Sequence, residues 1–210
     1  MADNMGGIDG LDFIRLDILK EIGSIGSGNA ITALSQMLNK RISMSVPQVN
    51  LPEFKDIANF IGGAENLVIG ILVGMSGDIN GIMMFLVPYD SAHKLLEIVM
   101  GDMGIAVAAN EFTEMERSAL TEVGNILISS YLGAFAGLIE KAIKPTVPSL
   151  SIDMANAILS VPAIEFGKVG DRALFIESVF DAEGSNVSGY FLLVPDMDSF
   201  NIILASLGVK

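Results

Sequence analysis

The sequence contains no cysteine and no tryptophan, and it has a single histidine. The absence of cysteine excludes disulfide bonds and thiolate metal sites. His93 alone cannot build a histidine-rich site, and the surrounding residues predict that it lies on the outer face of a helix. Basic residues are also few, since 12 lysines and arginines stand against 25 acidic residues and give a net charge of −13. We therefore expect neither a nucleic acid nor an anionic membrane as a partner, because both are bound through basic patches.

Long hydrophobic runs without polar interruptions are also missing, although 51% of the residues are hydrophobic. The longest uncharged runs, 22–39 and 123–139, contain Gly, Ser, Asn, Thr or Gln. They predict helices buried on most sides and no membrane span. Residues 1–10 hold three glycines, two aspartates and no basic residue, which predicts a short flexible tail and no signal peptide. A cytoplasmic protein is the resulting expectation.

The first helix is predicted over about 11–39, where hydrophobic residues recur at helical spacing. Three glycines interrupt it, at Gly23, Gly26 and Gly28. Glycine costs a helix up to about 1 kcal/mol relative to alanine, so three of them indicate either close packing against another element or a kink. No strand precedes these glycines, which argues against a dinucleotide-binding loop.

Further elements follow from period-two and period-3.6 patterns that end at Pro or Gly. After the first helix we predict a strand, a short helix, two strands and a helix, at 41–46, 53–61, 66–75, 79–87 and 89–100. The small residues of 101–110 then form an internal boundary. After it we predict a long helix, an extended piece, a weaker helix, two strands and a final helix, at 111–141, 145–151, 153–159, 173–180, 188–194 and 198–207.

The order of elements thus occurs twice, and the residues repeat as well. The segment 19–23 (LKEIG) aligns with 120–124 (LTEVG) at an offset of 101 residues, and 85–88 (FLVP) aligns with 192–195 (LLVP) at an offset of 107. We therefore predict one domain, 1–210, made of two repeats at about 11–101 and 111–208. The expected fold is a two-layer α/β (α+β) domain with pseudo-two-fold symmetry. Its sheet is largely antiparallel, with the long helices outside and meeting near the axis.

Each long helix carries a polar stripe. Ser118, Glu122 and Asn125 are spaced i, i+4 and i+7, so they share one helix face. Taken alone, this stripe is either a solvated surface or a small site that handles water and charge. The first repeat has a stripe with the same spacing, made of Asp17, Glu21 and Ser24.

The doubled pattern resembles a known family. Asp/Ser-x3-Glu-x2-Asn-x22-Pro is similar to the signature of the CheC/CheX/FliY phosphatases of bacterial chemotaxis. The second repeat carries the complete pattern and ends at Pro148, whereas the first ends at Pro47 and has Ser24 where the family has asparagine. Two copies in one chain resemble the CheC type, because CheX has one copy and dimerises.

The resemblance implies a substrate and partners. The expected substrate is the phosphorylated aspartate of a CheY-type response regulator, which would supply Mg²⁺, so that this chain needs no metal or cofactor of its own. A second expected partner is CheD, a receptor-modifying deamidase. The alternative is a mainly non-catalytic module that binds CheD or belongs to the flagellar switch.

The residue types fit this chemistry unequally in the two repeats. A neutral carboxamide can hold the attacking water beside an anionic phosphate, and we assign this role to Asn125. Glu122 is expected to pair with a cation on the regulator. The resemblance implies that this cation is the regulator's invariant lysine. Ser118 lines the interface, and Pro148, like Pro47, shapes the turn. The first site (Asp17, Glu21, Ser24) is expected to be weak or inactive, with Glu21 at most a docking residue, because the serine hydroxyl is shorter.

Overall fold

The computed structural model describes residues 13–45, 48–101, 107, 111–166, 173–182 and 185–207. In chain order the elements are α1 (Phe13–Leu38), β1 (Ile42–Met44), β2 (Gln48–Asn50), the 3-10 turn η2 (Phe54–Asp56), α2 (Ile57–Phe60), β3 (Leu67–Gly77), β4 (Gly81–Pro88), α3 (Tyr89–Met100), α4 (Glu114–Ile139), β5 (Ile143–Pro145), β6 (Ser149–Met154), α5 (Ala155–Phe166), β7 (Leu174–Ala182), β8 (Ser185–Pro195) and α6 (Met197–Ser206). The predicted elements are therefore confirmed in type and order. The predicted tail, 1–10, and Pro47 lie outside the described residues.

All eight strands form one antiparallel sheet. Its order is β1-β7-β8-β4-β3-β5, with β2 also paired to β7 and β6 also paired to β3. The hairpins β3–β4 and β7–β8 occupy the centre and meet where β4 pairs with β8. The short strands of each repeat form the two edges.

The strand register confirms the pseudo-two-fold symmetry. Leu72 pairs with Ser149, and the equivalent pair in the other half is Glu177 with Gln48. At the centre Phe85 pairs with Phe191, and their ring centroids are 4.8 Å apart. Because the symmetry exchanges these two phenylalanines, the axis passes between them. The offset between β4 and β8 is therefore 106 residues, one less than the offset predicted from 85–88 and 192–195.

The two repeats exchange their first strands. β1 and β2 belong to the first repeat, yet both pair with β7 of the second. Likewise β5 and β6 of the second repeat pair with β3 of the first. The sequence did not predict this exchange, and β2 was not predicted at all. Each edge of the sheet is thus built jointly by the two repeats.

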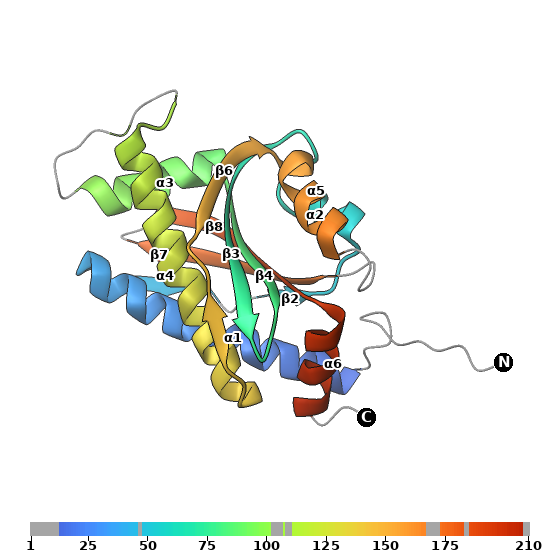
Figure 1. The fold of residues 1–210 in the computed structure, drawn as a ribbon. Helices are drawn as coiled ribbons and strands as arrows, with labels where there is room; N and C mark the ends of the chain where they lie inside the picture. The colour runs from blue at the N-terminus through green and yellow to red at the C-terminus, as the bar shows by residue number, and fades with distance from the viewer. Residues whose placement is uncertain are drawn as a thin grey trace.

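Helices cover both faces of the sheet (Figure 1). The larger hydrophobic core lies on the face of α1, α3 and α4, and α1 packs directly against α4, as the symmetry predicts. The smaller core lies on the other face, beneath the short helices α2 and α5, an addition to the predicted two layers. By length and mean hydropathy, 1.4, α4 could cross a membrane, but it packs on the sheet and on α1.

Two details of the sequence interpretation are resolved by packing. Helix α1 runs unbroken through its glycines, and a Cβ at Gly26 would collide with the ring of Tyr131. Close packing, one of the two alternatives, therefore explains that glycine. The outer-face prediction for His93 was wrong, because its half-buried ring lies 4.9 Å from that of Tyr89 and 4.6 Å from that of Phe112.

Candidate functional site

The helix that carries the complete motif begins at a capping box. The Thr113 side chain accepts a hydrogen bond from the Glu116 amide, and Glu116 Oε2 accepts bonds from the Thr113 amide and hydroxyl at 2.6 and 2.8 Å. Glu116 is buried, so this reciprocal cap fixes where α4 starts. The sequence interpretation missed both residues and began the helix at 111, although Thr-x-x-Glu before a hydrophobic run is the usual signal. Ser118 follows one turn later.

The polar stripe of α4 lies on its outer face, as the helical spacing predicted. Ser118 and Glu122 are exposed, and Asn125 is half-buried. The opposite face holds hydrophobic residues that pack into the larger core: Leu120, Val123, Leu127, Tyr131 and Phe135. The three polar groups therefore form a row that a protein surface can reach, with the carboxamide set deepest.

A glycine between Glu122 and Asn125 brings α4 close to the sheet. A Cβ on Gly124 would lie 2.6 Å from Cδ1 and 2.9 Å from Cγ2 of Ile71 in β3. These distances are far below van der Waals contact, so only glycine allows this approach. Gly124 is buried and adjoins Asn125 in the chain. The height of Asn125 above the sheet is thus set by contact between a helix backbone and a strand side chain.

The motif proline lies in a segment that is tied to the same strand. Pro148 is half-buried and directly precedes β6. Two residues earlier, the amide of Thr146 donates to the carbonyl of Gly74 in β3, and the amide of Gly74 donates to the Thr146 hydroxyl, both at 2.9 Å. Helix α4 packs against both β5 and β6. The loop that contains Pro148 is therefore held beside the motif helix.

The incomplete motif lies on α1. Glu21 and Ser24 are exposed, as a polar outer face predicts. Asp17 belongs to the same helix, but its side chain, like all of Pro47, lies outside what the structure describes. The two motif helices pack against each other, yet no described contact joins the two polar stripes. Each of the two motif helices thus carries its own polar row.

A buried hydroxyl cluster connects the two motif helices beneath these rows. The Ser27 hydroxyl of α1 donates to the Gly23 carbonyl at 2.6 Å and hydrogen-bonds the Tyr131 hydroxyl of α4. The Tyr131 hydroxyl is also 3.3 Å from that of Ser178 in β7. Burial is the largest influence on Tyr131 and raises the pKa of its phenol above the usual value of 10.0. Nothing in the sequence indicates these polar partners of Tyr131, because Ser27 and Ser178 are distant from it in the chain.

The polar row on α4 consists of hydrogen-bonding side chains, and no metal-binding cluster accompanies it among the described residues. Among the residues that the structure describes, no group of three or more His, Asp or Glu side chains could hold a metal ion. Ser118, Glu122 and Asn125 instead provide a hydroxyl, a carboxylate and a carboxamide on one accessible face. Such a row can bind a cation through the carboxylate and orient a water through the carboxamide.

Comparison with known proteins gives the family. The profile of the CheC-like family matches residues 14–51 and 115–152, one segment in each repeat. The chain is 35% identical to the CheY-P phosphatase CheC of Bacillus subtilis, over 98% of this chain and 100% of that protein.

Two solved structures share the fold. FliY from Thermotoga maritima superposes with a TM-score of 0.73 at 21% identity, covering 95% of this chain and 98% of that one. CheX in the CheX–CheY–BeF3–Mg²⁺ complex from Borrelia burgdorferi gives a TM-score of 0.50 at 14% identity, covering 87% and 99%. With the doubled family match and the extended identity to CheC, these similarities lead to one conclusion: the chain belongs to the CheC-like family.

Proposed function

We propose that this chain is a CheY-P phosphatase, which hydrolyses the phosphoaspartate of a CheY-type receiver at the Ser118–Glu122–Asn125 row. The relative that is 35% identical over almost the whole chain is named a CheY-P phosphatase. The observation that carries the proposal is that the complete motif lies on an accessible face of α4, with Asn125 held close to the sheet through Gly124. The cytoplasm is the compartment in which we expect this reaction.

The proposed step is hydrolysis of an acyl phosphate. The oxygen of one water attacks phosphorus while the bond from phosphorus to the aspartate oxygen breaks, which leaves a carboxylate and dihydrogen phosphate. Positioning supplies most of the catalysis in phosphoryl transfer, because the water must lie in line with the bond that breaks. The Asn125 carbonyl oxygen would accept a hydrogen bond from this water, and its neutral charge does not repel the phosphoryl group.

Glu122 has a different proposed role. Its carboxylate is exposed one turn before Asn125, where it would repel a phosphate but can pair with a cation on the receiver. We assign it to docking, against the receiver lysine that the family resemblance implies, and Ser118 to the rim of the same contact. Mg²⁺ would neutralise charge on the phosphoryl oxygens, and we expect the receiver to bring it.

The test is the single-turnover decay of a phosphorylated CheY-type receiver. Asn125→Ala should slow the decay by about 10²-fold, because the water loses its positioning group. Asn201→Ala is the matched control, since it removes an exposed carboxamide from α6 and should leave the rate unchanged. An unchanged rate for Asn125→Ala would show that the assignment is wrong.

The first site is tested in the same assay. Ser24 is exposed at the position that aligns with Asn125, and Glu21 aligns with Glu122. If this row still docks a receiver, Ser24→Asn should raise the decay rate, and it should do so even when Asn125 is replaced by alanine. If Ser24→Asn does not raise the decay rate, either with Asn125 present or with alanine in its place, the first row is a solvated surface without a docking role.

The alternative is a binding module for CheD or for a flagellar switch, and the FliY-like fold is the observation that favours it. Capture of CheD by the wild-type protein, measured beside the decay assay, separates the possibilities. Binding of CheD without faster receiver decay supports the module. Faster decay that depends on Asn125 supports the phosphatase.

A further inference from the structure

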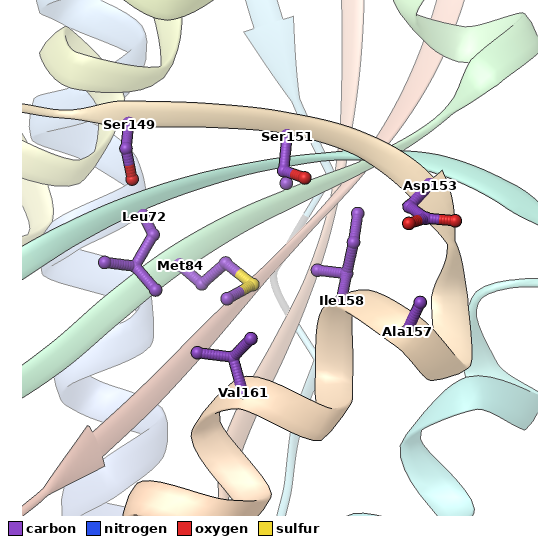
Figure 2. Close-up of a pocket in the computed structure, with 9 residues that line it drawn as sticks. Leu72, Met84, Ser149, Ser151, Asp153, Ala157, Ile158 and Val161 are labelled. Carbon is purple, nitrogen blue, oxygen red and sulfur yellow. The ribbon is translucent and has the colours of Figure 1, made fainter.

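A cavity of about 310 Å³ lies on the face of the sheet opposite the motif helices. Figure 2 shows it between β6 on one side and α5 on the other, with Leu72 and Met84 from β3 and β4 between them. Its apolar lining is Gly70, Leu72, Met84, Ala157, Ile158 and Val161. Its polar lining is Ser149, Ser151 and Asp153, which alternate along β6 and so share one face of that strand. The volume is at the lower end of the range for small-molecule sites.

The pseudo-two-fold axis explains why the cavity exists. At the equivalent place in the other half, three aromatic rings fill the space. Phe175 lies between Phe60 and Tyr190, with ring centroids 5.3 and 5.4 Å away. The strand pairing that aligns Leu72 with Glu177 places Gly70 at the position of Phe175.

The other two ring positions are also occupied by smaller side chains. Met84 stands in the place of Tyr190, because it pairs with Leu72 as Tyr190 pairs with Glu177. Val161 stands in the place of Phe60 at the offset of 101 residues, which also aligns the buried Ile57 with the buried Ile158. The cavity is therefore the space that three packed aromatic rings occupy in the other half.

One wall of the cavity carries negative charge that the other half lacks there. Asp153 aligns with Pro52, so the carboxylate is specific to the half with the cavity. Its Oδ1 accepts a hydrogen bond from the Met154 amide at 2.7 Å, and the carboxyl group is exposed to solvent. The hydroxyls of Ser149 and Ser151 continue this polar wall. The net charge of −13 also favours a cationic ligand over an anionic one.

From these observations we propose that the cavity binds a small aryl-alkyl ammonium ion, whose ring packs against Met84, Ile158 and Val161 and whose ammonium group pairs with Asp153. The ring replaces the aromatic side chains of the other half. The ammonium group finds an acceptor oxygen at the end of β6. This site is on the far face of the sheet from Asn125, so its ligand would not occupy the proposed phosphatase row.

The experiment is a titration of the full chain with phenethylammonium chloride, followed by amide chemical shifts. We expect saturable shifts in β6 and α5 with a Kd of about 1 mM, given the few heavy atoms of the probe. Val161→Phe restores the ring of Phe60 and should abolish them. Asp153→Asn should weaken binding about tenfold, whereas neutral phenethyl alcohol should bind this variant as it binds the wild type.

Two control variants match these changes. Ile164→Phe adds a ring to α5 at a position that is 77% exposed and does not line the cavity, and Asp198→Asn removes an exposed carboxylate from α6. Both should bind the amine as the wild type does. The proposal is overturned if the shifts do not saturate, or if folded Val161→Phe binds the amine normally. Equal affinity of the wild type for the alcohol and the amine would also overturn it, whether or not the variant folds.

Discussion

Gly124→Ala should shift Asn125 and slow the reaction while changing the stability of the fold only slightly. The added Cβ would lie 2.6 Å from Cδ1 and 2.9 Å from Cγ2 of Ile71. Rotation of the Ile71 side chain can move Cδ1 away but cannot relieve both contacts. Helix α4 must therefore rise from β3 by at least about 0.5 Å to bring Cγ2 back to van der Waals distance. Asn125 is the next residue and rises with it.

The expected effects on stability and rate differ in size. Alanine stabilises a helix by about 1 kcal/mol relative to glycine, and overpacking costs about 1–3 kcal/mol, so the net destabilisation is about 0–2 kcal/mol. A shift of this kind at a group that positions the attacking water should slow receiver dephosphorylation about 10-fold to 10²-fold. The loss of activity should therefore exceed what the small loss of stability explains.

The assay pairs receiver decay with urea unfolding and uses Gly133→Ala as the control. Gly133 is on the same helix, and a Cβ there meets nothing within 4 Å, so this variant should gain about 0.5–1 kcal/mol and keep its rate. Adding Ile71→Ala to Gly124→Ala removes both Cδ1 and Cγ2, the two atoms that the new Cβ meets, and should recover part of the rate. The reasoning is refuted if Gly124→Ala behaves like Gly133→Ala in both measurements.

Two further predictions concern stability. Tyr131→Phe should cost about 1–2 kcal/mol at pH 7, because Ser27 and Ser178 each lose a buried hydroxyl partner. Burial raises the pKa of Tyr131, so the stability it contributes is complete below about pH 10 and is lost as pH rises through the folded-state pKa. Urea unfolding at rising pH should show a shallower alkaline loss for the variant, and an identical slope would contradict this. Thr113→Ala should cost about 1 kcal/mol, because the Glu116 amide loses the hydroxyl that caps it, whereas Thr32→Ala, an exposed mid-helix change, should not destabilise.

Local patterns predicted the elements well, because their causes are local. Hydrophobic periodicity and terminal Gly or Pro predicted α3 at its observed bounds, 89–100, and both central hairpins. Helical spacing also placed Ser118, Glu122 and Asn125 on one exposed face, since that follows from 3.6 residues per turn. The repeat predicted the symmetry that the strand register confirms.

What the sequence could not predict depends on contacts between distant residues. Nothing near β1 or β2 in the chain indicates that they pair with β7. The close approach of Gly124 to the sheet depends on Ile71, and the environment of His93 depends on Phe112. The cavity could not be predicted from the sequence for the same reason. Gly70 indicates a missing ring only when the strand pairing aligns it with Phe175.

The exchange of strands also affects how the chain can be made. β1 and β2 are synthesised early, but their partner β7 leaves the ribosome only after more than a hundred further residues. The first repeat therefore cannot complete its part of the sheet while it emerges, and α1 has no finished surface to cover until α4 and β7 have followed. Such distant pairing makes folding slow and late. A chain interrupted between the repeats would leave two fragments, each lacking the strands that pair with its own hairpin.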